Sequence, residues 1–272
     1  MINSPEVSIC IPVYNGAKYI RETIMSVLQQ DFNDFELLIF DNASSDATLR
    51  IVESFSDQRI KIFKSSETIS PSLNWNRGIQ HARGRWVKLL CADDILLESS
   101  LSICLNAASE NPTVIAVAGS RSVINEIGRE VIGSNKITDS IRTINHMDLA
   151  AMTLRQATNP VGETLGVIWR SDIVRSSEGF SFVWKYFIDI DFWLRISKHG
   201  DFLILPNVVG SFRISRSAWT KTIGLRAITE AKEFYFGHDS FSGYSKLKRT
   251  RALTIASVKI VLRVMFINLR SK

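Results

Sequence analysis

The stretch Trp86-Val87-Lys88-Leu89-Leu90-Cys91-Ala92-Asp93-Asp94 decides the fold, because an apolar run of strand length ends in two adjacent carboxylates. A buried strand that delivers acidic side chains at its carboxyl end is typical of α/β proteins, which bind ligands at that edge of the sheet. Adjacent carboxylates repel each other unless a cation or hydrogen bonds offset their charge. The stretch therefore predicts a site for a metal ion and a diphosphate. A helix N-cap explains Asp93 or Asp94 equally well.

Three earlier segments have the β-branched, apolar composition of buried parallel strands, and they alternate with segments of helical spacing. Strands that alternate with helices within the first hundred residues predict a parallel sheet with right-handed connections. The expected strands are Val7–Val13, Phe35–Phe40 and Ile60–Phe63, and two of the expected helices are Ala47–Phe55 and Leu73–His81.

The second half of the chain is less regular. Residues 120–146 are polar, and we expect them to form a loop over the sheet edge. The other elements expected here are helices at Ser99–Ala108 and Phe192–Ile196, and strands at Thr113–Ala118, Leu165–Trp169, Phe202–Leu205 and Val208–Arg213.

From about Thr222 onward the pattern is helical, and residues 246–272 carry eight basic residues and no acid. Lys259, Arg263 and Arg270 fall near one face of this helix, and apolar residues occupy the rest. A basic amphipathic helix of this kind predicts attachment to an anionic membrane surface. The alternative is a helix that packs on the domain and turns a basic stripe to solvent.

Composition places the chain among ordinary globular proteins, with 272 residues, 45% of them hydrophobic and 22% charged. The net charge of +6 is moderate, and we expect no nucleic-acid partner. The cysteines Cys10, Cys91 and Cys104 lack paired spacing, which favours reduced thiols in a cytosolic protein. We expect no signal peptide, because the first strand begins almost at once, and no membrane-spanning helix.

The ends of the first strands carry polar groups suited to a nucleotide. Asp41 follows the second strand and Tyr14 follows the first, and no glycine-rich dinucleotide or Walker motif is present. Adjacent parallel strands end at one crevice, so these residues should share a pocket with Asp93 and Asp94. A carboxylate there can accept a hydrogen bond from a base, and an aromatic ring can stack on it. The alternative for Asp41 is an Asx-turn.

Several segments stand in a characteristic order along the chain. They are Ile11-Pro12-Val13-Tyr14-Asn15-Gly16, Asp41-Asn42-Ala43-Ser44-Ser45-Asp46-Ala47-Thr48, Asn76-Arg77-Gly78 with Ala82-Arg83-Gly84, Leu90-Cys91-Ala92-Asp93-Asp94, and Phe187-Ile188-Asp189-Ile190-Asp191-Phe192-Trp193-Leu194-Arg195. This order resembles that of the family 2 glycosyltransferases, which are inverting enzymes with the GT-A fold that use nucleotide-diphosphate sugars. The resemblance is dense over about the first hundred residues.

The resemblance implies a role for each matching residue on the donor side. Asp93 and Asp94 would hold a divalent cation, Mg²⁺ or Mn²⁺, and Asp93 would also contact the ribose or donor sugar. The cation would neutralise the departing nucleotide diphosphate. The residues implied to contact the nucleotide or its sugar are Pro12, Tyr14, Asn15, Asp41, Asn76 and Asp93.

On the acceptor side, the resemblance assigns Asp189 as the base that removes the acceptor hydroxyl's proton. Asp191 is the competing carboxylate, a candidate acceptor contact whose alternative role is a helix N-cap. Glu163 and Thr164, in the loop 159–164, resemble acceptor-binding residues of polysaccharide-assembling members. Arg195 is expected to be structural, pairing with a nearby acid.

The sequence departs from the family pattern at three places. Cys91 replaces the first acid of the usual D-x-D, which leaves metal ligation to the two acids after it, and Ile188 replaces the acid that often precedes the base. Ser215 stands where many members have histidine. Arg213 or Arg216, on either side of it, is a candidate contact for the diphosphate.

We therefore expect an α/β protein with a GT-A-like, Rossmann-like, mostly parallel sheet flanked by helices. Residues 1–100 would bind the nucleotide sugar, residues 101–217 would bind the acceptor and supply the base, and residues 218–272 would form a basic helical extension on the membrane. The activity would be metal-dependent, inverting transfer from a UDP- or dTDP-sugar to a hydroxyl of a lipid-linked glycan acceptor. This reaction would serve bacterial surface polysaccharide synthesis, of the O-antigen or capsule type, at the inner face of the cell membrane.

Two other functions are considered. The replacements at Cys91 and Ile188 are consistent with a catalytically decayed subunit of a polysaccharide assembly complex that only binds nucleotide or glycan. A sugar nucleotidyltransferase is less favoured, because such enzymes need a glycine-rich, basic loop near the first strand, and Gly16, Lys18 and Arg21 alone stand there.

Overall fold

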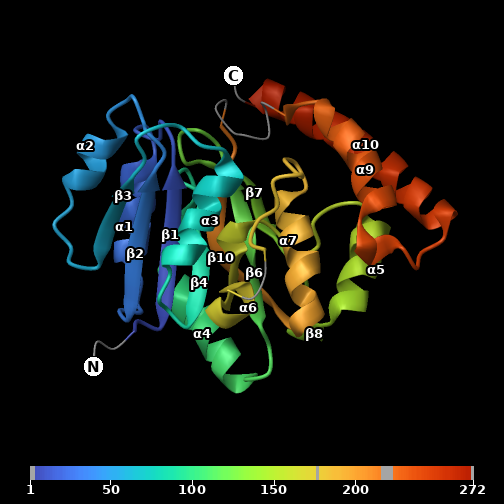
Figure 1. Ribbon diagram of the computed structural model, residues 1–272, viewed down its shortest axis with the longest axis horizontal. Coiled ribbons are helices and arrows are strands. Elements are labelled where there is room, and N and C mark those ends of the chain that lie inside the picture. Colours follow the sequence, from blue (N-terminus) through green and yellow to red (C-terminus); the bar gives the residue numbers. More distant parts are fainter. Residues whose placement is uncertain (1–3, 176–177, 216–222, 271–272) are drawn as a thin grey trace.

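A computed structural model describes residues 4–175, 178–215 and 223–270 of the chain (Figure 1). In this part of the chain ten strands form one sheet in the order β3-β2-β1-β4-β9-β6-β10-β5, with β7 paired to β6 and β8 paired to β10. Helices flank the sheet, and the predicted α/β class with a mostly parallel sheet is confirmed.

The first half of the sheet is parallel throughout. β1 lies between β2 and β4, and β3 is at the edge beside β2. All seven residues of β2 are buried, as its continuous apolar sequence predicts. The strands are β1 (Val7–Val13), β2 (Phe35–Asp41), β3 (Ile60–Lys64) and β4 (Trp86–Leu89), and the helices between them are α1 (Ile20–Leu28), α2 (Thr48–Glu53) and α3 (Pro71–His81).

The second half of the sheet mixes both directions. β6 and β10 are parallel, whereas β9 pairs antiparallel with β4 and with β6. The two strands expected at 202–205 and 208–213 are one strand with shifts of register between Ile204 and Gly210. The elements are β5 (Ile95–Leu96), α4 (Ser100–Glu110), β6 (Ala116–Ile124), β9 (Val167–Arg170), α6 (Ser171–Arg175), α7 (Ile188–Ile196) and β10 (Phe202–Arg213), with short 3₁₀ turns at Thr164–Gly166, Ser197–His199 and Asp239–Phe241.

The loop expected over residues 120–146 is wrong in part. β6 runs on to Ile124, and the segment also contains β7 (Glu130–Asn135), β8 (Arg142–Ile144) and the start of α5 (His146–Gln156). β7 pairs through its backbone with β6 while its side chains are largely exposed. An exposed strand needs no apolar run, so hydrophobic periodicity does not detect it.

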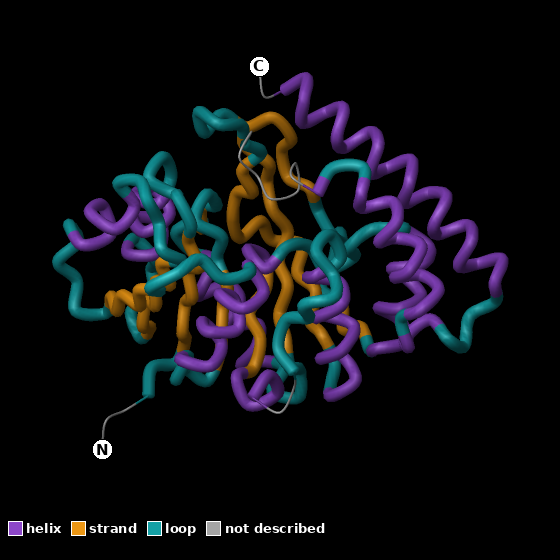
Figure 2. The backbone as a smooth tube through the Cα atoms, turned by 45° about the horizontal axis from the view of Figure 1, so that its top comes forward, coloured by secondary structure: helices purple, strands orange, loops and turns teal. Residues whose placement is uncertain are grey.

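Two long helices, α9 (Arg226–Gly237) and α10 (Lys246–Arg270), follow the sheet. They lie beside α5 and α7 on the side away from β1–β3, and α10 runs along the outer edge of the molecule (Figures 1 and 2). Ala252, Ala256 and Ile260 of α10 are buried in the same core as Trp193 and Phe234. None of the described helices has the length and apolar character needed to span a membrane.

Candidate active site

The predicted acid pair lies at the carboxyl edge of the parallel strands. β4 ends at Leu89, and a turn then carries Asp93 and Asp94. In the neighbouring strands, Val13 is opposite Asp41 and Cys10 is opposite Leu89, so three strands end at one edge. The following helix α4 has Ser99 as its N-cap residue. The N-cap role considered for Asp93 and Asp94 is therefore wrong.

A cavity of about 200 Å³ opens beside this turn. The side chains that line it come from several regions that are distant in sequence, which the fold brings together. They include Cys91, Asp93 and Asp94 after β4, Glu163 and Thr164 before β9, Asp189 in α7, and Lys259 and Arg263 in α10.

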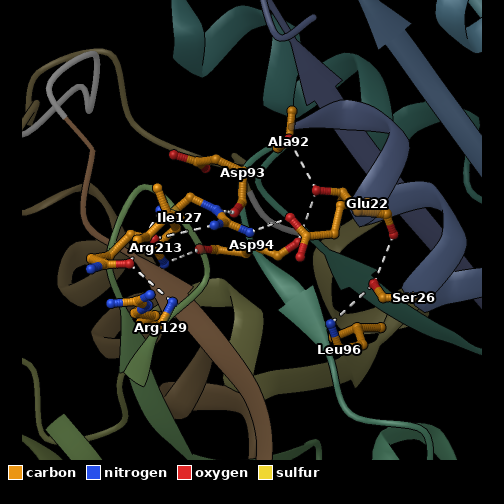
Figure 3. Close-up of polar contacts among 11 residues, drawn as sticks. Glu22, Ser26, Ala92, Asp93, Asp94, Leu96, Ile127, Arg129 and Arg213 are labelled. Atoms are coloured by element: carbon orange, nitrogen blue, oxygen red, sulfur yellow. Dashed lines mark hydrogen bonds and ion pairs between the residues drawn. The ribbon is translucent and has the colours of Figure 1, made fainter. Parts of the chain in front are cut away.

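Arg213, the last residue of β10, holds in place the turn that carries Asp93 and Asp94, which we call the acid turn. Its backbone N–H donates to Asp94 Oδ1 at 3.0 Å, and its Nε donates to the Asp93 carbonyl at 2.8 Å. The remaining guanidinium nitrogens reach the Asn125 carbonyl at 3.2 Å and Glu22 Oε2 at 2.5 Å (Figure 3). The side chain is fully buried among these groups. Arg213 thus supports the acids instead of contacting a diphosphate directly, and Arg216 lies outside the described residues.

The environment of the acid pair disfavours two free negative charges. Burial raises the pKa of Asp93, although Arg213 opposes this, and burial together with the charge of Asp93 raises the pKa of Asp94. A bound cation would offset both effects. No group of three or more His, Cys, Asp and Glu side chains suited to a metal occurs in the described residues. Two carboxylates with a substrate diphosphate fit the way in which Mg²⁺ is usually bound.

Cys91 does not replace the missing acid as a charged group. Burial and the carboxylates of Asp94, Asp93 and Asp189 raise the pKa of its thiol well above the usual value, so it is neutral. The Thr164 side chain, which is buried, shares a hydrogen bond with this thiol.

Asp189 lies in the first turn of α7 and faces the cavity. Its Oδ1 is shielded from solvent and has no hydrogen-bond partner among the described residues. Burial and the negative charge of Glu163 raise the pKa of Asp189 to about 7, against the opposing effect of Arg263 and Arg121. A carboxylate with these properties is suited to accept a proton near neutral pH.

Glu163 is held by Arg121, a residue that the sequence analysis missed. The two side chains form a two-pronged ion pair, with Nη2–Oε1 at 2.8 Å and Nε–Oε2 at 2.5 Å. Glu163 therefore lines the cavity as a fixed, paired charge. A charged residue inside the apolar strand Ala116–Ile124 is the signal that could have drawn attention to Arg121.

The expected acceptor contact at Asp191 is corrected by the structure. Its carboxylate is buried and accepts hydrogen bonds from Arg195 Nε at 2.9 Å and Nη2 at 2.7 Å, and it lies 3.3 Å from His238 Nε2. Burial alone would raise its pKa, but the bonds from His238 and Arg195 lower it overall. The N-cap of α7 is Phe187, so that alternative is also wrong. The structural role expected for Arg195 is confirmed.

Four of the residues predicted to hold the nucleotide, Pro12, Tyr14, Asn15 and Asp41, border the sheet edge and do not line this cavity. Asp41 is buried, and its Oδ2 accepts the N–H of Ser44, three residues on, at 3.2 Å, whereas the Asx-turn considered would bond the N–H two residues on. Its Oδ1 has no partner among the described residues. Tyr14, beyond Pro12 at the end of β1, is 54% exposed. Asn15 has a φ of +50° and joins the two loops, because its Oδ1 accepts the Ser45 N–H at 2.8 Å.

Asn76 does not contribute to this edge. Its Nδ2 donates to the Phe180 carbonyl at 2.9 Å and its Oδ1 accepts the Phe180 N–H at 2.7 Å. Both the oxygen and the nitrogen of the Asn76 amide therefore bind the backbone at Phe180, so the amide is not free for the nucleotide contact expected from the sequence.

The start of α7 is held by a carboxylate from the C-terminal helices. Glu230 of α9 accepts three backbone N–H groups on its Oε1, from Lys185 at 3.0 Å, Tyr186 at 2.7 Å and Phe187 at 2.9 Å. The Asp191–His238 contact joins the same helices. Local sequence carries no signal for Glu230, because its partners lie more than forty residues away.

Replacing Glu230 with alanine should leave these N–H groups without an acceptor. We expect the free energy of unfolding, measured with denaturant, to fall by about 1–3 kcal/mol. Glu230→Gln should lose less, because an amide oxygen still accepts hydrogen bonds. The control is Glu233→Ala, an exposed position on the same helix, with an expected change within about 0.5 kcal/mol. Equal effects of the two alanine variants would contradict the role assigned to Glu230.

Comparison with known sequences matches residues 8–163 to the family described as glycosyl transferase family 2. An uncharacterized glycosyltransferase of Haemophilus influenzae is 27% identical over 219 residues, covering 79% of this chain and 67% of that protein. The Escherichia coli UDP-Glc:alpha-D-GlcNAc-diphosphoundecaprenol beta-1,3-glucosyltransferase WfgD is 27% identical, covering 78% of each chain. The match spans 65% of a Mycobacterium tuberculosis relative and 46% of a second Haemophilus protein.

Solved structures show the same architecture. Staphylococcus aureus TarS 1–349 in complex with UDP-GlcNAc has a TM-score of 0.64 at 16% identity, covering 98% of this chain and 88% of that one. The mannosyltransferase PcManGT from Pyrobaculum calidifontis, in complex with GDP-Man and Mn²⁺, has a TM-score of 0.66 at 17% identity, covering 98% and 74%. At these identities the likeness establishes the fold. The family match covers more than half of the chain, and the chain therefore belongs to glycosyl transferase family 2 and has the GT-A fold.

Proposed function

We propose that this glycosyltransferase moves a sugar, with inversion, from a UDP- or dTDP-sugar to a hydroxyl of a lipid-linked glycan in bacterial surface polysaccharide synthesis. The observation that carries the proposal is Asp189, which lines the same cavity as Asp93 and Asp94 and whose shielded Oδ1 has no hydrogen-bond partner among the described residues. The names of WfgD and of the TarS complex, which mention UDP-Glc, a diphosphoundecaprenol-linked sugar and UDP-GlcNAc, support this choice of substrates.

The reaction needs a base on the acceptor side and a stabilised leaving group on the donor side. The acceptor oxygen forms a bond to the anomeric carbon while the bond from that carbon to the diphosphate oxygen breaks. The bonding electron pair leaves with the nucleoside diphosphate, and the hydroxyl proton passes to Asp189. Attack from the face opposite the leaving group inverts the anomeric centre. The raised pKa of Asp189, about 7, lets it take this proton at neutral pH and release it afterwards.

Asp93 and Asp94 would hold Mg²⁺ or Mn²⁺, which would supply positive charge to the diphosphate. The Mn²⁺ in the PcManGT complex supports this assignment. The Asp41 Oδ1 and the exposed ring of Tyr14 would bind the base, with Pro12 and Asn15 completing that side of the nucleotide pocket. The binding-only subunit considered above shares these groups, and hydrolysis of a UDP-sugar by the purified chain would count against it.

We also infer that α10 attaches the protein peripherally to the inner face of the membrane, where a lipid-linked acceptor would lie. The basic side chains expected to face lipid do not all do so, because Lys259 and Arg263 line the cavity. The outer side of the helix instead exposes apolar residues, with Val258 at 55%, Leu262 at 58% and Met265 at 56%. Exposed apolar side chains on a helix without acids suit an anionic bilayer.

The activity should rise with pH through a midpoint near 7, because Asp189 accepts a proton only in its ionised form. Glu163→Gln should move this midpoint to lower pH, since the Glu163 charge helps to raise the Asp189 pKa. Asp189→Asn should reduce kcat by about 10²–10⁴-fold while UDP affinity stays nearly constant. Steady-state rates across pH and calorimetric titration with UDP would measure both. Near-normal turnover in Asp189→Asn would show that another group is the base.

Replacing one carboxylate of the pair should remove most of the dependence of UDP binding on the metal ion. In the parent protein, UDP should bind more tightly with Mn²⁺ than with a chelator. Asp94→Asn should abolish most of that gain, a loss on the order of tenfold or about 1.4 kcal/mol. The asparagine still accepts the hydrogen bond from the Arg213 N–H, so the turn should remain folded. Parent affinity for UDP that does not depend on Mn²⁺ would refute a metal role for the pair.

Membrane attachment can be tested by sedimentation with lipid vesicles. The parent should bind vesicles that contain phosphatidylglycerol more tightly than vesicles of phosphatidylcholine alone, because α10 carries positive charge. Replacing Leu262 and Met265 with serine should weaken this binding on the order of tenfold. Ile141→Ser is the control, since Ile141 is 60% exposed and lies just before β8, not in α10. Equal binding by the parent and the double variant would argue against docking through this face.

A further inference from the structure

The cavity has a cationic side to which the roles above assign no task. Lys259 and Arg263 are four residues apart in α10 and therefore lie on one face of the helix. Both line the cavity, together with Ala256 and Ile260 of the same face. The fold thus places two positive side chains in the space that also contains Asp189.

Among the residues that the structure describes, no carboxylate lies within ion-pair distance of Arg263. Its guanidinium lies 5.9 Å from the centre of the Phe212 ring. The nearby acids are already used, because Glu163 pairs with Arg121 and Asp191 pairs with Arg195. Arg263 is nevertheless close enough to Asp189 to lower its pKa.

Lys259 makes one hydrogen bond within the described part of the chain. Its Nζ donates to the Gln156 carbonyl at 2.7 Å, which fixes the ammonium at the end of α5. An ammonium group carries three protons, so two remain for a ligand. A guanidinium and an ammonium on one cavity wall form the combination that recognises phosphate groups, the first through paired hydrogen bonds and the second as a point charge.

We propose that Lys259 and Arg263 form a diphosphate-binding subsite contributed by the C-terminal helix. This inference rests on the proposed function, which supplies two sources of the same chemistry. One source is the nucleoside diphosphate of the donor, and the other is the diphosphate of a lipid-linked acceptor. In either case the subsite places a polyanion beside Asp189, and the turn at Asp93–Asp94 faces the same space.

The test uses the full-length protein and diphosphates of each kind. Calorimetric titration with UDP probes the donor source, and titration with farnesyl diphosphate probes the lipid source. Uridine and farnesol are the matched ligands without a diphosphate. The variants are Lys259→Met and Arg263→Gln, and the control is Arg251→Gln, an exposed position on the same helix. Since α10 also packs into the core, each variant is first compared with the parent by thermal unfolding.

Each cavity variant should bind at least one of the two diphosphates about tenfold more weakly than the parent, a loss of about 1.4 kcal/mol. The affinities for uridine and farnesol should not change, and the diphosphate that weakens identifies the source. Arg263→Gln should also move the pH midpoint of activity upward, because it removes a charge that favours ionised Asp189.

Two outcomes separate the failure of this subsite from failure of the proposed function. If Lys259→Met and Arg263→Gln bind UDP and farnesyl diphosphate as tightly as Arg251→Gln does, the subsite is wrong. The proposed function would still stand in that case if the parent binds UDP. A parent that binds neither diphosphate would overturn both.

Discussion

The site depends on two adjacent carboxylates at the end of a central strand, Asp93, which is half-buried, and Asp94, which is fully buried. Like charges in a shielded place are tolerated only if other groups stabilise them. Arg213 does so with its backbone N–H and its guanidinium, and it comes from β10, about 120 residues further along the chain. Glu22 of α1 in turn binds Arg213. The acid turn, where we propose that the nucleotide diphosphate binds, is therefore complete only when the last long strand has joined the sheet.

The C-terminal helices hold the segment that carries Asp189, the proposed base, in a comparable way. Glu230 binds the backbone just before α7, and His238 contacts Asp191 within that helix, so α9 fixes the segment that carries Asp189. α10 then adds Ala252, Ala256 and Ile260 to the main core. Because α10 is part of the core, membrane attachment cannot be its only role. Its two sides are suited to two tasks, with cations toward the cavity and apolar side chains toward the outside.

The sequence predicts those parts of the molecule that are local in character. The parallel strands follow from continuous apolar runs, and the acid turn follows from the end of one such run. It does not predict β7, whose pairing with β6 is a backbone property. Nor does the sequence show that Asn76 hydrogen-bonds to the backbone of Phe180. The same holds for the contacts of Asp191 with Arg195 and His238, because such contacts form only after distant segments have packed. A motif locates a carboxylate, but only the fold shows whether its oxygens are free.

The thiol at Cys91 can be understood from the charges around it. Asp93, Asp94 and Asp189 all affect its ionisation, so an acid at this position would act on the same three carboxylates in return. A fourth negative charge would raise the pKa of Asp189, already about 7, and leave less of this carboxyl group ionised at neutral pH. A neutral thiol that binds Thr164 avoids that cost. In the proposed mechanism, the loss of one potential metal ligand thus keeps the pKa of Asp189 lower, and the proposed subsite of Lys259 and Arg263 would supply part of the positive charge that the diphosphate needs.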